Sequence, residues 1–293
     1  MERFTIKDIE NLSQIKAHTL RIWEQRYTFF TAKRKDSQHR YYDGHDLQVL
    51  LQVAFLYHGG MKISHIAALD EAGRLAAIER IQQRGGIAEQ EVLSLVQSAA
   101  AFDERRLRGQ LDRLVAQKGL EAAVLDVFFP FLQRIGHLWL TNHVIPAQEH
   151  FSSYLIQNKI ISETEQLPPQ EPSRAPIVLL TPRGEHHELP LLFINYLLRR
   201  EGWAVTYLGT GVSVPDLPPS VLGRGNYIYV HLITNLSGQS ADDYFESVCK
   251  AFPEKTFVVS GSAIQGMQRQ FRNLVLLRTD DAILQFIRKG LPG

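Results

Sequence analysis

A carboxylate and two imidazoles stand together in one short loop of this sequence. Glu185, His186 and His187 follow a continuous apolar run at residues 177–181, which is typical of a strand buried on both faces. Ligands of open α/β sheets bind beyond the carboxyl ends of such strands, and a glutamate two residues before a histidine can fix the ring's tautomer for metal binding. We therefore predict a ligand site at Glu185 and His187, with His187 as the metal ligand; a solvated polar loop is the alternative.

The elements around this loop are predicted to form a sheet. Strand-like runs occur at residues 177–181, 204–208, 227–233, 256–260 and 274–277. Helical patterns lie between and after them, at residues 189–200, 240–251, 263–271 and 282–289. This alternation predicts a doubly wound parallel sheet. No Gly-x-Gly-x-x-Gly follows the first strand, so the pattern does not favour a dinucleotide as the ligand.

A second group of residues that could do chemistry lies near the beginning of the chain. Between residues 16 and 40 there are seven Lys and Arg residues and two acidic ones, although the net charge of the whole chain is only +1. Thr5 is predicted to begin a short helix through Leu12, and Ser13 to cap a second, basic helix. Two short helices and a basic loop predict a helix-turn-helix that contacts DNA. An exposed charged helix with a solvated loop is the alternative.

The middle of the chain, from residue 88 to about residue 166, has helical periodicity throughout. Its apolar residues recur at i, i+3 and i+4, which predicts a small four-helix bundle, and a proline-rich connection separates it from the sheet. Within this segment Trp139 precedes the pair Glu149-His150 by nine intervening residues. The three side chains could line one concave face; a core tryptophan and a surface pair are the alternative.

The composition limits the class of protein. The chain has 293 residues, enough for two or three domains, with 44% hydrophobic and 22% charged residues, as in ordinary globular proteins. Its single cysteine, Cys249, excludes an intramolecular disulfide and fits a reducing compartment. The sequence shows neither a signal peptide nor an apolar run of membrane-spanning length, so we expect a cytoplasmic protein that does not enter a membrane.

The first seventy residues resemble a known family. The run Thr19-Leu-Arg-Ile-Trp-Glu-Gln-Arg-Tyr27, a later Arg34 and His39-Arg-Tyr-Tyr42 are similar to the MerR family of winged helix-turn-helix regulators. The resemblance implies that a recognition helix and a wing bind double-stranded DNA, with Trp23 in the core. The residues it places near bases or nearby phosphates are Lys16, His18, Thr19 and Arg21. Those it assigns to the DNA backbone are Arg26, Arg34, Arg40 and Tyr42.

The bundle and the sheet resemble cobalamin-binding domains. The spacing of Trp139 and Glu149-His150 is similar to that in cobalamin-dependent, light-sensing MerR repressors of carotenoid genes, in which the bundle covers the upper face of the cofactor. Glu185-x-His187 resembles the Asp/Glu-x-His-x-x-Gly motif of methionine-synthase-type domains, whose histidine is the lower ligand of cobalt. In those domains a Ser-x-Leu and a Gly-Gly follow later strands, and small residues let the nucleotide tail run beside the sheet. Their counterparts here are Thr234, Leu236, Ser260 and Gly261.

Three positions depart from these families. Pro190 stands where the histidine motif has glycine, and Ser260 replaces the first residue of Gly-Gly. Leu140 follows Trp139 directly, where the light-sensing relatives carry a histidine. A response to light is therefore implied less directly than the binding of cobalamin.

Together these features predict a multidomain α plus α/β protein, with a winged helix-turn-helix at residues 1–84, a bundle at 87–166 and a cobalamin-binding sheet domain at 176–293. We expect a repressor, not an enzyme, whose assembly is controlled by cobalamin, most simply adenosylcobalamin. The helical pattern after Asp70 stops at Gly85-Gly86, too early for a pairing coiled coil, so a dimer or tetramer must form through the other domains. A regulator with a degenerate sensor and a cobalamin-carrying enzyme subunit are the alternatives.

Overall fold

The computed structural model describes residues 4–13, 15–27, 30, 32–34, 40–82, 88–140, 146–168, 173–223, 225, 227–234 and 239–291. The chain forms two compact units, Met1–Ser153 and Tyr154–Gly293. The three domain boundaries expected from the sequence stay a prediction. No helix in the described ranges is long and apolar enough to cross a membrane.

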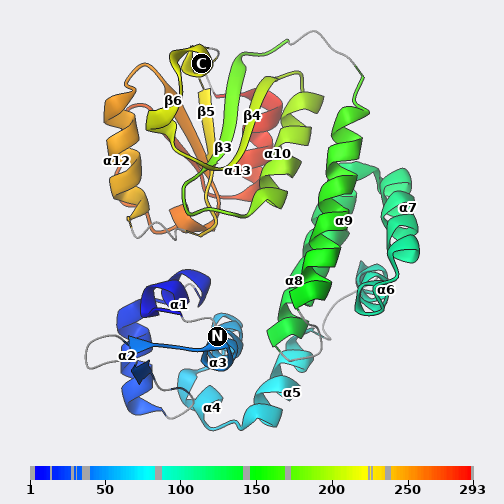
Figure 1. Ribbon diagram of the computed structural model, residues 1–293, viewed down its shortest axis with the longest axis vertical. Helices are drawn as coiled ribbons and strands as arrows, with labels where there is room; N and C mark the ends of the chain where they lie inside the picture. The colour runs from blue at the N-terminus through cyan, green and yellow to red at the C-terminus, as the bar shows by residue number, and fades with distance from the viewer. Residues whose placement is uncertain are drawn as a thin grey trace. The chain divides into compact units, whose positions relative to one another are not determined.

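The first unit begins with a small helical domain that carries a two-stranded wing (Figure 1). Its elements are α1 (Ile6–Ser13), α2 (Ala17–Arg26), β1 (Lys33–Arg34), β2 (Arg40–Tyr41), α3 (Gly44–His58), α4 (Ile63–Ala67) and α5 (Glu71–Gln82). Buried side chains such as Ile9, Leu20 and Val53 form its core. The predicted helix-turn-helix with a wing is confirmed. The predicted cap is wrong, because Ser13 is the last residue of α1 and α2 begins after Lys16.

Charged side chains fix the wing to the start of α3. The carboxylates of Asp43 and Asp46 each accept from the other residue's backbone N–H at 3.0 Å, the reciprocal pattern of a capping box. The ammonium of Lys33, on β1, donates to both carboxylates, at 2.8 Å to Asp46. Hydrogen bonds from Lys33 and from the backbone of Asp46 lower the pKa of Asp43 to about 2. Lys33 therefore has a structural partner on α3.

The rest of the first unit is a helical bundle. It contains α6 (Ala88–Ala100), α7 (Glu104–Ala123), the π-helical turn η1 (Val124–Phe128), α8 (Phe129–Leu140) and the beginning of α9 (Pro146–Glu165). Leu107, Leu111 and Leu114 on α7 are buried, as the helical periodicity requires. Gly119 adopts a φ of 77° and bends α7, a conformation that favours glycine. The predicted bundle is thus present.

The second unit is built on a five-stranded parallel sheet in the order β4-β3-β5-β6-β7. Its strands are β3 (Pro176–Pro182), β4 (Ala204–Val212), β5 (Tyr227–His231), β6 (Thr256–Ser260) and β7 (Leu274–Leu277). Its helices are α10 (Glu188–Arg200), α11 (Pro219–Leu222), α12 (Ala241–Ala251) and α13 (Asp280–Lys289), with short 3-10 turns η2 (Val214–Asp216) and η3 (Ser262–Ile264). α12 covers one face and α10 and α13 cover the other, so the predicted doubly wound sheet is confirmed (Figure 1).

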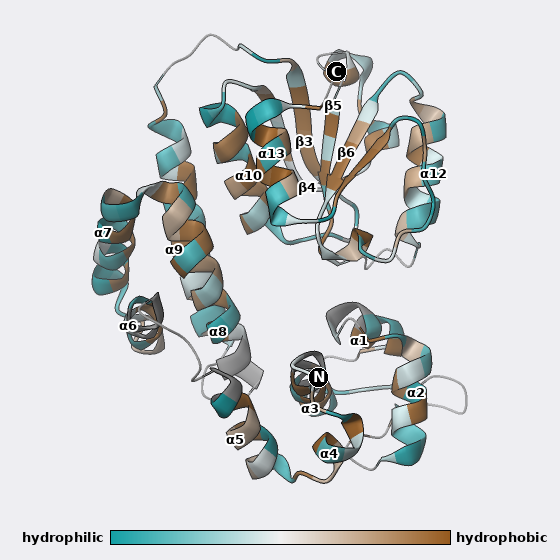
Figure 2. Ribbon diagram, turned by 180° about the vertical axis from the view of Figure 1, so that it is seen from behind, coloured by the Kyte–Doolittle hydropathy of each residue, from teal (hydrophilic) through white to brown (hydrophobic). Residues whose placement is uncertain are grey.

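Burial explains why the strands read as continuous apolar runs. Ile228 and Val230 on β5 pack with Phe245 of α12, whereas Tyr227 and Tyr229 point to the other face and contact Phe286 of α13. Figure 2 shows β3 and β6 as mainly hydrophobic and the covering helices as mixed, in agreement with a sheet that is buried on both sides.

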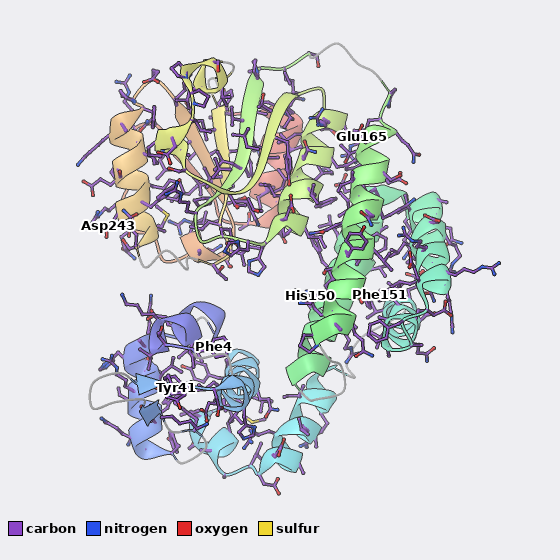
Figure 3. The ribbon with its side chains drawn as sticks, in the orientation of Figure 1. Phe4, Tyr41, His150, Phe151, Glu165 and Asp243 are labelled. Atoms are coloured by element: carbon purple, nitrogen blue, oxygen red, sulfur yellow. The ribbon has the colours of Figure 1, made fainter. Side chains whose placement is uncertain are left out.

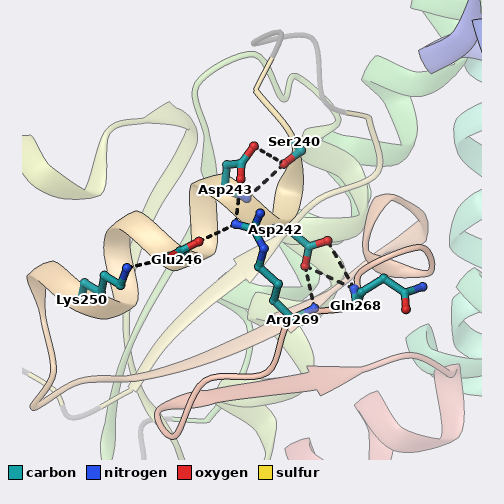
Figure 4. A network of polar contacts seen from close by, with 7 residues as sticks. All are labelled: Ser240, Asp242, Asp243, Glu246, Lys250, Gln268 and Arg269. Carbon is teal, nitrogen blue, oxygen red and sulfur yellow. Dashed lines mark hydrogen bonds and ion pairs between the residues drawn. The ribbon is translucent and has the colours of Figure 1, made fainter.

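The predicted helix at residues 263–271 is wrong. Only η3 forms there, and the chain then runs in an extended loop to β7. Side chains satisfy the backbone of this loop instead of helical hydrogen bonds: Arg278 donates to the carbonyls of Ile264 and Met267 at 2.7 and 2.9 Å. Asp242 accepts from the N–H of Arg269 at 3.0 Å, and the Arg269 guanidinium bonds acidic residues of α12 (Figure 4).

Candidate functional site

The loop with Glu185 and His187 lies at the point where the strand order of the sheet reverses. β3 has β4 on one side and β5 on the other, so the connections after β3 and β5 leave toward opposite faces. Open α/β sheets bind ligands in the crevice at such a switch point. Glu185 and His187 follow β3, and Thr234 follows β5, so both sides of the switch point supply predicted site residues.

A tight turn directs Glu185 back toward the sheet. The N–H of Glu185 bonds the carbonyl of Pro182 at 3.1 Å, and Gly184 has a φ of 83°, which the third position of a type II turn requires. The hydroxyl of Thr181 donates to the carbonyl of Glu185 at 3.0 Å and accepts from the N–H of Gly211, on β4, at 3.2 Å. The loop is thereby fastened to two neighbouring strands.

The carboxylate of Glu185 is fully buried and has four hydrogen-bonding contacts. Its Oε1 accepts from the backbone N–H of His187 at 2.9 Å and lies 2.6 Å from Nδ1 of the same residue. Its Oε2 accepts from the N–H groups of Ile233 and Thr234 at 2.7 and 2.6 Å. One buried side chain therefore joins the loop after β3 to the loop after β5.

These contacts keep Glu185 charged inside the protein. Burial by itself would raise the pKa of the carboxyl, but the hydrogen bonds from His187 and from the backbone of Thr234 outweigh it and lower the pKa to about 2. An ionised carboxylate beside Nδ1 favours the tautomer that carries its proton there, which makes Nε2 the nitrogen suited to a metal.

The exposure of the two loop histidines agrees with a ligand role for His187. Half of its side chain, 50%, is exposed, although its carboxylate partner is at 0%. His186 is exposed and takes no part in the Glu185 contacts. Among the described residues no group of three or more His, Cys, Asp and Glu could hold a metal ion. A single histidine suits a metal that arrives in a macrocycle, because the macrocycle supplies the equatorial ligands.

Thr234 and Gly261, two further predicted residues of the sheet unit, have different roles. Thr234 gives its backbone N–H to Glu185, and its buried hydroxyl has no hydrogen-bond partner among the described residues. Buried polar atoms without a protein partner are typical of positions that meet water or a ligand. Gly261 has a φ of 112°, and a Cβ there would lie 2.1 Å from the carbonyl oxygen of Leu232, so its glycine serves backbone packing. Leu236 lies outside the described residues.

A buried polar chain that the sequence analysis missed lies beside the pair. Ser260, fully buried at the end of β6, has its Oγ 2.8 Å from the hydroxyl of Tyr229 and 2.8 Å from Nδ1 of His231. The signal was the alternation of Tyr227, Tyr229 and His231 along one face of β5. Burial lowers the pKa of His231 to about 4, so its ring is neutral at neutral pH.

The predicted residues of the bundle are placed only in part. Glu149 and His150 lie in the first turn of α9, with 3.2 Å between Oε2 and Nδ1. His150 is exposed to solvent and Glu149 is partly exposed; Figure 3 labels His150. The backbone of Trp139 belongs to α8, but its side chain lies outside the described residues, as does that of Leu140. The structure thus brings Glu149 and His150 together and leaves Trp139 a prediction.

The predicted DNA-contact residues of α2 share an accessible surface. Lys16, His18, Arg21 and Arg26 are exposed and Thr19 is partly so, whereas Trp23 is buried and packs edge-on against Tyr57 at 5.0 Å. Lys16 pairs with Glu10 at 3.3 Å but keeps most of its side chain in solvent. The helix therefore presents a basic face and buries its tryptophan, as expected for a recognition helix.

The predicted wing residues lie in or next to the β1–β2 pair. Arg34 and Arg40 lie opposite each other in the β1–β2 pair, and their side chains lie outside the described residues. Tyr42 is buried at 2% exposure and packs near Phe30 at 6.0 Å, while its backbone pairs with Phe4. Tyr42 therefore packs in the core beneath the wing, and its assignment to the DNA backbone stays a prediction.

Two regions of the chain match known protein families. Residues 4–73 match the model of the MerR HTH family regulatory protein, and residues 93–161 match that of the B12 binding domain. The chain joins a MerR helix-turn-helix domain to a B12-binding domain. The MerR domain contains α2 and the wing, and the B12-binding domain contains Glu149 and His150.

Two curated relatives match this chain along most of their length. The HTH-type transcriptional repressor CarH of Myxococcus xanthus is 28% identical to this chain over 277 residues, covering 90% of this chain and 91% of the relative. The repressor CarA of the same organism is 27% identical over 222 residues, covering 74% and 70%. The chain is therefore homologous to transcriptional repressors.

A solved structure supports the fold of most of the chain. The monomethylamine corrinoid protein of Methanosarcina barkeri matches with a TM-score of 0.53 and 12% identity, covering 69% of this chain and 99% of that one. At this identity the match shows a shared fold, with a parallel sheet and helices.

Proposed function

We propose that this protein is a transcriptional repressor that binds DNA through α2 and the wing, and whose DNA binding is controlled by a corrinoid, most simply adenosylcobalamin, held through His187. The observation that carries the proposal is the buried Glu185 carboxylate, which orients an exposed imidazole at the switch point of the sheet. The MerR domain and the homology to CarH and CarA support the DNA-binding half.

The sheet unit fits the ring of a corrinoid. Nε2 of His187 would be the lower ligand of cobalt, with Glu185 holding the imidazole by its other nitrogen. The hydroxyl of Thr234, which has no partner within the part of the chain that the structure describes, would bind a polar group of the ligand. When bound, the corrinoid supplies a reactive cobalt–carbon bond; the protein supplies its orientation. In the B12-binding domain, Trp139, Glu149 and His150 stay the predicted residues for the upper face.

The DNA half of the proposal rests on the exposed basic face of α2. Lys16, His18, Thr19 and Arg21 would approach base edges or nearby phosphates, and Arg26, Arg34 and Arg40 the backbone. A single winged helix reads one half-site, so a two-fold operator needs two copies held about one helical turn apart. α5 has only 12 residues, too few for a long pairing helix. We therefore propose that the bundle and sheet supply the homo-oligomer, a dimer or tetramer, whose assembly the corrinoid promotes.

The experiment combines ligand and DNA binding in the full chain. Spectral titration with adenosylcobalamin, in the dark and after illumination, should show binding that His187→Ala abolishes and the matched His186→Ala keeps. Duplexes selected by the wild-type chain from a random library should bind Arg21→Ala roughly tenfold or more weakly. Arg105→Ala, on the exposed surface of α7, is the control for the lost charge. Equal ligand losses in both histidine variants would contradict the lower-ligand assignment, and unchanged DNA affinity in Arg21→Ala would contradict the recognition helix.

One observation favours a second function. Ser260 and Pro190 depart from the cobalamin motif, and the place of Ser260 is filled by protein side chains. A regulator whose sheet domain serves assembly alone would have this appearance. Light scattering of the full chain with and without adenosylcobalamin separates the two: an unchanged mass together with no spectral change favours the assembly module.

A further inference from the structure

The sheet contains a packed polar chain where the sequence resemblance expects small residues and a nucleotide tail. Ser260 stands in the place of the first glycine of Gly-Gly, beside the tail of the resembled domains. Here its Oγ is bonded to Tyr229 and to His231, each at 2.8 Å. All three residues are buried, at 0%, 0% and 6% exposure for Ser260, Tyr229 and His231.

The strand register explains why these three side chains meet. His231 pairs with Ser260 across β5 and β6, so both side chains point to the face covered by α10 and α13. Tyr229 lies two residues earlier on the same face, and the ring of Phe286 from α13 lies 5.9 Å from its ring. Aromatic packing closes one end of this group. His231, at the other end, is the last residue of β5, directly before the loop whose Ile233 and Thr234 N–H groups donate to Glu185.

The polar groups of Tyr229, His231 and Ser260 are hydrogen-bonded to one another, so separating these side chains costs free energy. The Ser260 hydroxyl lies between a phenol and an imidazole, so each group has a partner without water. A tail inserted between the sheet and the helices would displace Tyr229 or His231 and leave the others without partners in a buried place. Close packing of this kind leaves no room for an added ring.

We infer that Tyr229, His231 and Ser260 exclude the nucleotide tail from the sheet, so that this domain selects corrinoids by the ring and takes them with the tail absent or held outside. The inference rests on the proposed function, because it presumes that His187 binds a corrinoid. It refines the ligand of that function: adenosylcobalamin would bind only with its tail held outside the sheet, and corrinoids without a nucleotide tail bind better than cobalamin itself. The three side chains determine specificity without touching cobalt.

The direct test compares two ligands on the full wild-type chain. Cobinamide, the corrinoid that lacks the tail, and cobalamin are titrated as their cobalt(II) forms into protein labelled uniformly with ¹⁵N. Cobinamide should bind about tenfold or more tightly than cobalamin. Electron paramagnetic resonance should show the splitting of a ¹⁵N axial ligand with cobinamide, because the ligand nitrogen then comes from His187 of the labelled protein.

Each outcome separates the inference from the proposed function. Equal affinity for both ligands, with ¹⁵N splitting in both, would overturn the inference, because cobalamin would then have given up its own base and found room for the tail; the proposed function would stand. Binding of neither ligand would overturn the proposed function and the inference with it.

Variants test the three side chains themselves. Tyr229→Ala should open the space and reduce the preference for cobinamide by at least about threefold. The matched control is Tyr227→Ala, which removes the same ring from the same face at the start of β5. If Tyr229→Ala fails to fold by circular dichroism, the milder pair Ser260→Gly with His231→Ser takes its place. A folded variant of either kind that keeps the wild-type preference would overturn the assignment of these residues.

Discussion

The chain contains two glutamate–histidine pairs, and their surroundings differ. In the sheet unit, Glu185 is fully buried, its carboxylate lies 2.6 Å from Nδ1 of His187, and three backbone N–H groups donate to it. In the bundle, Glu149 and His150 lie 3.2 Å apart with side chains 39% and 79% exposed. The two pairs look similar in the sequence, but in the fold one glutamate is buried and held by hydrogen bonds and the other is partly exposed.

The difference shows what makes such a pair a site. Backbone donors and burial give Glu185 a fixed position and a lowered pKa, so the imidazole beside it has a defined orientation. The exposed pair competes with water and gains little from its contact. A glutamate–histidine spacing in the sequence therefore indicates a site only where the fold also supplies hydrogen bonds that hold the glutamate in place.

The largest effect on the free energy of unfolding is expected when the buried carboxylate of Glu185 is removed. Glu185→Ala should lower the free energy of unfolding of the sheet unit by about 3–5 kcal/mol, because the N–H groups of Ile233 and Thr234 would lose their acceptor in a buried place. Urea unfolding followed by the fluorescence of Trp203, in a chain whose Trp23 and Trp139 are Phe, measures it. A loss below about 1 kcal/mol would mean that water replaces the carboxylate readily.

The contrast also explains how far the sequence could predict the site. Glu185 and His187 are two residues apart in one loop, so their spacing is visible without a structure. The groups that hold Glu185 are backbone N–H groups of Ile233 and Thr234, which have no residue-type signature and come from another strand's end. Only the strand order shows that these two loops meet.

The elements of the fold that depend on local sequence were also easier to predict than those that depend on distant contacts. The strands were predictable because continuous apolar runs ended by turn residues are a strong local signal, and all five are confirmed. The helix expected at residues 263–271 does not form, because backbone groups there bond to side chains distant in sequence. Arg278 donates to the carbonyl of Ile264, and Asp242 accepts from the N–H of Arg269. The chain of Tyr229, His231 and Ser260 required the register of β5 against β6.

A smaller effect on the free energy of unfolding is expected from the titration of His231, which is buried and contacts Ser260 instead of a carboxylate. His231 has a pKa of about 4, mainly because burial disfavours its charged form, whereas in the unfolded chain it has its ordinary value near 6.5. The unfolded state therefore takes up a proton first as the pH falls. Stability should be full above about pH 6.5 and decline by up to about 3 kcal/mol toward pH 4.

Urea unfolding of the same Trp203 chain at pH 7.5, 6 and 5 checks the sign of this dependence. His231→Gln keeps a polar side chain of similar reach but cannot titrate, so its stability should change less over this range. A wild-type stability that rises on acidification relative to the variant would contradict a neutral buried ring.

The smallest effect is expected at the exposed pair. Glu149→Gln should change the free energy of unfolding of the bundle by about 0.5 kcal/mol or less, because water screens the contact with His150. What remains is the favourable position of a carboxylate in the first turn of α9, which is also weak at an exposed site. Urea unfolding followed by helical circular dichroism measures the change. Because the bundle stays folded, any loss of corrinoid affinity in Glu149→Gln would come from a contact with the ligand and would place this pair at the cofactor. A stability loss above about 1 kcal/mol would instead show that Glu149, like Glu185, has partners that fix it.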